Sequence, residues 1–459
     1  MSLTPHVLSR YSKSDGEYDN SEEILHQQWK DSSCAKRGVL RDHPNSLRTH
    51  PSLPNEILCR IFLESSGLDP GAPTTISHVC RSWRQIALDY CGLWTKIELR
   101  AKETRMDRAS AWADRAGRLS ISLGIRYSED TDLGSIMAWL RDKAHRIKSV
   151  SIMHLSRDEK NPLLSSLPPF KQLESFQIVG MEELDLDMRS IAQMLEGSPR
   201  LSSLSLSGVS GLHFHESLAN TAGHIRHLSI GANSYIDYAF PLRIDAVLDV
   251  ISACNGLVSL ECHALGTEDD HDPQIVSLPS LLSLTIGDGI ETCLILKYLH
   301  ASKLQTLSLV RGTHLDEAED VVEMPDMVFD RSGYNDLFVD CIRSLHETCS
   351  PPVTTIVWDG VNVDINVLQQ CSPYLRGMEE LRCNRIGSIP LSILSWETGG
   401  SRRLFPCLRR IVLTECTSKT TSLDAIHRII NQNGVVPGLR REQLIVEDGD
   451  AITVYLKAT

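Results

Sequence analysis

The chain has 459 residues, of which 41% are hydrophobic and 23% are charged, a composition typical of globular proteins that excludes a largely disordered chain. The net charge of −13 argues against a general binder of nucleic acid or of membrane surfaces. No apolar run is long enough to predict a transmembrane helix.

The first fifty residues differ in character from the rest. Residues 1–20 are polar and predicted to be a disordered tail, and residues 21–50 are predicted to form a short helix and a linker. The start of the sequence has no apolar core of signal-peptide length. The thirteen cysteines are scattered and never spaced C-x-x-C, which favours a reducing compartment. We therefore expect a cytoplasmic protein, a nuclear protein, or both.

Residues 53–94 have the pattern of two short helices. In the first, four apolar residues form a predicted stripe that follows Pro54, a residue suited to a first helical turn: Ile57, Leu58, Ile61 and Phe62. The run LDPGAP then ends that helix. In the second, apolar residues recur at spacings of three and four: Ile76, Val79, Cys80, Trp83, Ile86 and Ala87. About forty residues cannot bury enough surface to be stable alone, so this unit needs a partner surface.

This segment resembles the F-box, in the variant common in basidiomycete fungi. Its first half matches the pattern L-P-x-E-I-L-x-x-I-F with Leu53, Pro54, Glu56, Ile57, Leu58, Ile61 and Phe62. Its second half matches V-C-R-x-W-R-x-I-A and a closing L-W with Val79, Cys80, Arg81, Trp83, Arg84, Ile86, Ala87, Leu93 and Trp94. One departure is Cys91, where the family often has proline. The F-box-like domain is predicted over residues 51–97.

The resemblance implies that this domain binds a Skp-type adaptor and, through it, the cullin and RING subunits of an SCF-type ubiquitin ligase. The residues implied in adaptor binding are Leu53, Pro54, Ile57, Leu58, Ile61, Phe62, Val79, Trp83, Leu93 and Trp94.

Beyond residue 94, the phrase apolar-x-x-apolar-x-apolar recurs. Clear copies begin at residues 147, 173, 201, 225, 257, 281, 304, 353, 378 and 408, and degenerate copies occupy 94–99 and 116–121. Most intervals between the clear copies are 23 to 32 residues, close to the leucine-rich-repeat period. Each phrase is predicted to be a short strand with its leucines in the core. Segments 186–199, 243–255 and 421–433 have helical spacing.

The predicted fold class is therefore α+β and multi-domain: small all-α F-box helices followed by an α/β leucine-rich-repeat-like solenoid, or horseshoe, over residues 98–438. The acidic run 315–330 interrupts the period, and we interpret it as a solvated loop or a mobile contact on the rim. Asp448-Gly449, between alternating apolar residues, predicts a hairpin cap over residues 439–459.

Sequence motifs of catalysis are absent. The chain has no phosphate-binding loop, dinucleotide-binding, zinc-protease or nucleophile-elbow pattern. The densest metal candidate is His213 and His215 with Glu216, but a pair without a third spaced ligand is more simply explained as surface histidines. We expect no catalytic residue, no metal and no cofactor, and the protein is not expected to be an enzyme. The alternative is an unrecognised enzyme that uses the histidines.

A solenoid offers instead an extended binding surface. The outward strand positions are small and hydroxylic in the middle of the ladder, whereas the C-terminal third carries long charged side chains. Arginine is a frequent anchor of interfaces. Our hypothesis places substrate contacts near Asp359, Arg382 and Arg410; the alternative is that these are only solvated strand positions.

These patterns together predict a substrate-recognition adaptor that binds an unknown protein substrate, but neither nucleic acid nor membrane. The alternative is a non-degradative interaction scaffold with an F-box and leucine-rich repeats.

Overall fold

The computed structural model describes thirteen segments of the chain, and every structural statement below concerns them: residues 53–100, 106–126, 132–155, 162–213, 216–231, 242–266, 274–287, 291–310, 331–360, 365–385, 405–414, 444–447 and 451–455. The chain divides into two compact units, Met1–Ile61 and Phe62–Thr459. The boundary between them falls inside one helix.

The described part of the first unit is residues 53–61, which contain the first half of helix α2 (Asn55–Leu68). The helix begins where the amides of Ile57 and Leu58 donate to the carbonyl of Pro54, at 3.0 and 3.1 Å. Proline suits this place because the first amides of a helix have no partner within the helix.

The second unit begins with the rest of α2 and continues with α3 (Ala72–Ser77), α4 (Arg81–Asp89) and the 3₁₀ turn η3 (Cys91–Trp94). The prediction of a single second helix was wrong, because the chain is extended at Cys80, with φ −155° and ψ 174°. The Sγ of Cys80 accepts the amide of Trp83 at 3.4 Å and so caps α4. Three helices therefore stand where two were predicted.

The remainder of the second unit is organised by one sheet of fourteen strands. Its twelve parallel strands, in sheet order, are β1 (Lys96–Arg100), β2 (Ile121–Arg126), β3 (Ile147–Leu155), β4 (Ser175–Asp187), β5 (Ser203–His213), β6 (His227–Gly231), β8 (Ser259–His263), β11 (Ser283–Gly287), β13 (Thr306–Val310), β14 (Thr355–Asp359), β15 (Glu380–Asn384) and β16 (Arg410–Thr414). Every predicted strand phrase lies in this sheet or leads into it. The solenoid is confirmed.

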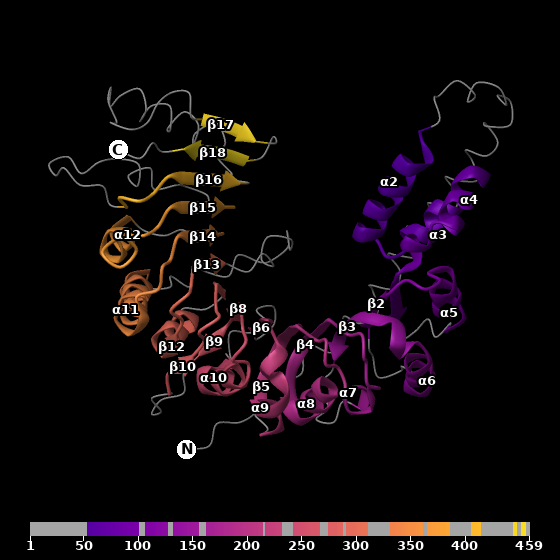
Figure 1. The fold of residues 1–459 in the computed structure, drawn as a ribbon, viewed down its shortest axis with the longest axis horizontal. Coiled ribbons are helices and arrows are strands. Elements are labelled where there is room, and N and C mark those ends of the chain that lie inside the picture. Colours follow the sequence, from indigo (N-terminus) through magenta and orange to yellow (C-terminus); the bar gives the residue numbers. More distant parts are fainter. Residues whose placement is uncertain are drawn as a thin grey trace, which may run out of the picture. The chain divides into compact units, whose positions relative to one another are not determined.

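Helices and short turns connect the strands and lie on one side of the sheet (Figure 1). They are α5 (Met106–Arg115), α6 (Leu133–Lys143), η5 (Ala144–Arg146), α7 (Pro162–Ser166), α8 (Met188–Glu196), α9 (Ser217–Thr221), η6 (Ala222–His224), α10 (Ile244–Ala253), η7 (Glu291–Tyr298), α11 (Arg331–Cys349) and α12 (Ile365–Cys371). Two small sheets pair β7 (Leu242–Arg243) with β9 (Leu265–Gly266) and β10 (Val276–Ser277) with β12 (Leu299–His300). Helices α8 and α10 confirm two predicted helices; the third, 421–433, lies outside the described residues.

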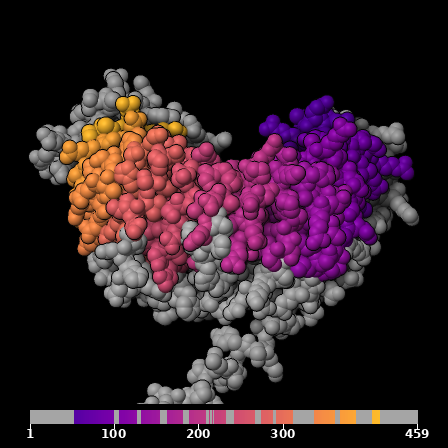
Figure 2. Space-filling model, turned by 60° about the horizontal axis from the view of Figure 1, so that its bottom comes forward, coloured from indigo at the N-terminus to yellow at the C-terminus, as the bar shows by residue number. Residues whose placement is uncertain are grey.

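The core of the solenoid is a ladder of apolar side chains contributed two per strand. In β5 these are Leu204 and Leu206, and in β8 they are Leu260 and Cys262, all of them buried. The strand register stacks each pair directly on the pair of the next strand. Full burial of one Leu or Ile side chain contributes about 1.5 to 3 kcal/mol. Across the space-filling surface the repeats follow one another in chain order (Figure 2).

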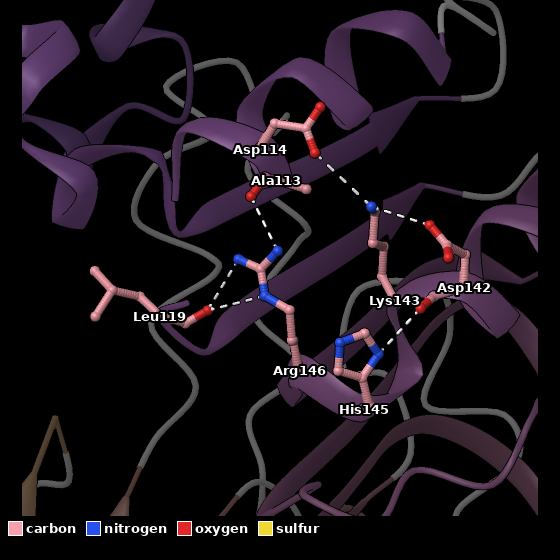
Figure 3. A network of polar contacts seen from close by, with 7 residues as sticks. All are labelled: Ala113, Asp114, Leu119, Asp142, Lys143, His145 and Arg146. Atoms are coloured by element: carbon pink, nitrogen blue, oxygen red, sulfur yellow. Dashed lines mark hydrogen bonds and ion pairs between the residues drawn. The ribbon is translucent and has the colours of Figure 1, made fainter. Parts of the chain in front are cut away.

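Polar contacts also join neighbouring repeats at the edge where the strands begin. The guanidinium of Arg146 donates to the carbonyl of Leu119, at 3.3 and 3.1 Å, and to that of Ala113 at 3.1 Å (Figure 3). Lys143 forms ion pairs with Asp142 at 3.0 Å and Asp114 at 3.8 Å. We call the contacts of Arg146 the Arg146 clamp. It satisfies carbonyls that the preceding repeat leaves without a partner in its own turn.

The described C-terminal strands run differently from the others. β18 (Ala451–Tyr455) pairs antiparallel with β16 and with β17 (Leu444–Glu447). This pairing confirms the predicted hairpin, although its turn at Asp448-Gly449 lies outside the described residues. So do residues 1–52 and the acidic run 315–330, and the predicted domain boundaries stay predictions. Within the described segments, every helix is too short or too polar to cross a membrane.

Candidate protein-interaction surfaces

Helix α2 carries apolar residues on two sides. Its buried side consists of residues at four-residue spacing: Leu58, Phe62 and Ser66, which are 8%, 1% and 3% exposed. Its exposed side is also apolar: Leu53, just before the helix, Ile57, Ile61 and Leu68 are 52%, 47%, 44% and 91% exposed. Since successive residues turn by about 100°, the exposed set lies about 120° around the helix from the buried set. The predicted stripe is therefore buried along one flank, at Leu58 and Phe62, and exposed along the other, at Ile57 and Ile61.

The exposed large apolar side chains of the described residues concentrate in the segment that contains α2. Ten such side chains are exposed among the described residues, and seven of them lie between residues 53 and 88: Leu53, Ile57, Ile61, Leu63, Leu68, Val79 and Leu88. Exposed apolar side chains gathered in one segment mark a candidate interaction site. Leu63, Leu68 and Leu88 were missed by sequence reasoning because they fall outside the family pattern.

The buried residues of this region hold it together. Phe62 packs on Trp83, with ring centroids 4.9 Å apart. The indole Nε1 of Trp94 donates to the carbonyl of Ala87 at 2.7 Å, and the Trp94 ring meets that of Trp112 in α5 edge-on at 5.4 Å. These contacts fix the end of the helical segment directly to the first repeat.

Burial therefore divides the ten residues predicted to bind the adaptor. Five are exposed: Leu53, Pro54, Ile57, Ile61 and Val79. Trp83 is half-buried, and four are buried: Leu58, Phe62, Leu93 and Trp94. A buried side chain can support a docking surface by holding its helices but makes no contact there itself. The assignment of the ten to an adaptor interface stays a prediction.

The sheet has a second accessible surface, on the side opposite its helices, which we call the open face. Five hydroxyl-bearing residues and one histidine stand side by side there through the strand register: Ser203, His227, Ser259, Ser283, Thr306 and Thr355. This agrees with the hydroxylic middle expected from the sequence.

In the middle of the open face, Glu261 and His263 form a pair. The Nε2 of His263 lies 2.8 Å from the carboxylate of Glu261, and this hydrogen bond lowers the pKa of that carboxyl against the opposing effect of burial. Glycines flank His263 on both neighbouring strands. A Cβ at Gly231 would lie 2.7 Å from that of His263, and one at Gly287 would overlap its ring. The backbone is thus shaped around this histidine.

The C-terminal part of the open face carries five charged residues, which we call the arginine cluster: Asp359, Glu380, Arg382, Arg385 and Arg410. Arg382 donates to Glu380, whose other oxygen lies 3.8 Å from Nη1 of Arg410. Arg385 donates to Asp359 at 2.6 Å.

The three residues predicted to contact substrate all belong to this cluster. Glu380 brings Arg382 and Arg410 together, whereas Asp359 pairs with Arg385. Sequence reasoning missed Arg385, which adopts a left-handed backbone conformation (φ 51°) just after β15. The sequence did contain a clue, because Arg385 directly follows a predicted strand whose inward and outward positions the repeat pattern indicates.

Burial suppresses the ionisation of several described thiols. It raises the pKa of Cys254 and of Cys371 to about 12, so both stay protonated. The sulfurs of Cys341 and Cys293 lie 3.9 Å apart, and this contact lowers the pKa of Cys341 while it raises the pKa of Cys293. As for metals, no three His, Cys, Asp or Glu residues come together among the described residues, and His215 lies outside them.

Comparison with known proteins identifies the domain that carries the first surface. Residues 50–100 match the F-box-like family model, so the helices around α2 form an F-box-like domain. The chain thus joins an F-box-like domain to a leucine-rich-repeat-like solenoid. The match is to the F-box-like family as a whole and does not distinguish the basidiomycete variant. No curated protein matches the chain.

Two solved structures are similar to the chain. One is the leucine-rich repeat-containing protein LegL7 from Legionella pneumophila, 11% identical, covering 74% of this chain and 99% of its own, with a TM-score of 0.36. The other is the Rad7 and Elc1 complex in yeast, 12% identical, covering 78% and 98%, with a TM-score of 0.24. At these scores neither likeness adds to what the strand ladder itself shows.

Proposed function

We propose that this chain is the substrate-recognition adaptor of an SCF-type cullin–RING ubiquitin ligase. In this proposal the exposed side of α2 docks on the Skp-type adaptor, which connects it to the cullin and RING subunits, and the open face of the solenoid binds a protein substrate. The observation that carries the proposal is the second apolar side of α2, within a segment that matches the F-box-like model.

This surface can supply part of the free energy of docking. Leu53, Ile57 and Ile61 each retain about half of their exposure. Completing the burial of such a side chain contributes about 1 kcal/mol, roughly half the value for full burial. Three such residues, with Pro54 beside them, supply several kcal/mol before the costs of association are subtracted.

The solenoid would act by proximity. A substrate held on the open face stays near the ubiquitin-conjugating enzyme, so the effective concentration of its lysines rises. The chain itself then makes and breaks no bond. Consistent with this, we propose that it is not an enzyme and needs no cofactor, and that it works in the cytoplasm or nucleus.

The direct test measures adaptor binding by calorimetry with the full chain. Ile57→Gln together with Ile61→Gln removes two apolar side chains while keeping residues of good helix propensity. We expect affinity for a Skp-type adaptor to fall about tenfold or more. The matched control, Leu119→Gln with Leu282→Gln, changes two similarly exposed leucines elsewhere and should bind normally.

Equal affinity of the two double variants would contradict docking on α2. Failure of the unaltered chain to bind any Skp-type adaptor would overturn the proposed function as a whole. Once binding is established, lengthened half-lives of bound proteins on loss of the chain separate a ligase adaptor from a non-degradative scaffold.

A further inference from the structure

Among the described residues, the arginine cluster has more guanidinium groups than carboxylates. It contains three guanidinium groups, from Arg382, Arg385 and Arg410, and two carboxylates, from Asp359 and Glu380. The net charge of the whole chain, by contrast, is −13. The cluster lies on β14, β15 and β16 and on the residue that follows β15, beside the largely hydroxylic middle of the open face.

Within the cluster the arginines are the more accessible groups. The side chains of Arg382, Arg410 and Arg385 are 50%, 35% and 27% exposed, whereas those of Glu380 and Asp359 are 17% and 23% exposed. Glu380 therefore lies lower in the surface than Arg382 and Arg410, whereas Asp359 and Arg385 are about equally accessible. Within these five residues the most accessible charged group is the guanidinium of Arg382.

The ion pairs also prepare the arginines for binding. An arginine side chain loses rotamer entropy when it is fixed. Here part of that loss has already occurred on folding, because Glu380 positions Arg382 and Asp359 positions Arg385. Preorganised groups of this kind bind more tightly for the same contacts.

The chemistry of a guanidinium selects the ligand. Its planar fork of N–H donors fits the two oxygens of a carboxylate and has no acceptor to offer a cation or an amide N–H. Neighbouring strands lie about 4.8 Å apart, and alternate side chains of an extended peptide about 6.5 Å apart. Arg410 stands opposite Glu380, and Arg382 stands opposite Val412, so the two arginines are one strand and two residues apart, about 8 Å by these spacings. Two carboxylates at alternate positions of an extended segment can reach both guanidinium groups, because the side chains on both sides are long.

We infer that the arginine cluster binds a segment of the protein substrate that is rich in aspartate and glutamate. This inference rests on the proposed function only in that the open face is the substrate surface. It names the class of segment taken up there, an extended acidic stretch, and adds Arg385 to the residues that bind it.

The experiment uses the full chain and a fluorescein-labelled peptide of about twelve residues that alternates glutamate with glycine and serine. Fluorescence anisotropy measures its affinity at about 50 mM and about 500 mM salt. We expect binding at low salt that weakens at high salt, and much weaker binding of the same peptide with glutamine for glutamate.

Two triple variants locate the site. Arg382→Ala, Arg385→Ala and Arg410→Ala together should lower affinity for the acidic peptide about tenfold or more. The control Arg118→Ala, Arg141→Ala and Arg376→Ala removes the same charge from exposed positions outside the cluster. Because the first triple leaves two carboxylates without their arginines, Arg382→Ala alone is the variant least able to disturb folding, and we expect a loss of about threefold.

The outcomes are separable from those of the adaptor test. Equal affinity for the glutamate and glutamine peptides would overturn the inference, as would equal losses in the two triple variants, while adaptor binding stayed intact. Binding of the acidic peptide by a chain that ignores the Skp-type adaptor would support the cluster and reject the ligase assignment.

Discussion

Helix α2 and the strands of the solenoid use their apolar residues in opposite ways. The strands bury apolar side chains at alternate positions against the rest of the chain, as Leu204 and Leu206 illustrate. In α2, Leu58 and Phe62 are buried, yet Ile57 and Ile61 are equally apolar and remain exposed. The described strands thus cover their own apolar side chains. The helix has a flank of apolar side chains that the described residues leave exposed.

The largest expected effect is a loss of stability on changing a buried residue of the helical segment. Trp94→Ala removes a fully buried ring, its hydrogen bond to Ala87 and its contact with Trp112. We expect unfolding to become easier by about 3 to 5 kcal/mol. Thermal denaturation followed by circular dichroism measures the change. A Tm equal to that of the unaltered chain would show that Trp94 is not a core residue.

A second variant tests the exposed side. Leu53→Ala with Pro54→Ala changes two residues that are accessible in the described structure. We expect adaptor binding to be abolished in co-purification, with Tm changed by no more than the equivalent of about 1 kcal/mol. Trp94→Ala lowers stability first and binding as a result; this variant should lower binding alone. Unchanged co-purification would contradict the assigned interface.

The smallest expected effect is a change in stability on the open face, where a polar contact contributes in place of apolar burial. The hydrogen bond with His263 lowers the pKa of Glu261 from its ordinary value of 4.5, so folding favours the carboxylate. The resulting stabilisation is complete above that value and is lost as the pH falls through the lower pKa of the folded state.

Glu261→Gln should therefore lower stability at pH 7 by less than about 1 kcal/mol, since the group is partly exposed. The difference from the unaltered chain should shrink below about pH 4. Glu196→Gln, on the exposed side of α8, is the control. A difference in Tm that did not change with pH would sink this explanation.

Much of the fold was predictable because its signal is repeated. One copy of the strand phrase is weak evidence for a strand, but ten copies at similar intervals predict a ladder of parallel strands. The register of the strands aligns equivalent positions of neighbouring copies. The two sides of α2 were harder, since Ile57 and Leu58 are adjacent in sequence and the pattern of apolar residues alone cannot tell which one faces the core. The break at Cys80 was missed because apolar spacing continues across it.

The arginine cluster was only partly predictable for a different reason. Asp359 and Arg385 are 26 residues apart and meet only because β14 and β15 are neighbours in register. The repeat pattern in the sequence shows which side chains of a strand point outward. It does not show the backbone conformation of the residue that follows the strand. Arg385 adopts a positive φ there, and the sequence alone could not predict that it pairs with Asp359.

The Arg146 clamp has a consequence for how the solenoid fails. In a linear stack each repeat is stabilised chiefly by contacts with its immediate neighbours. If the contacts between two adjacent repeats are weak, the stack can unfold on one side of that interface before the other. Arg146 donates three hydrogen bonds to two carbonyls of the preceding repeat. Without them the first repeats would come apart ahead of the rest, and a single melting transition would become two.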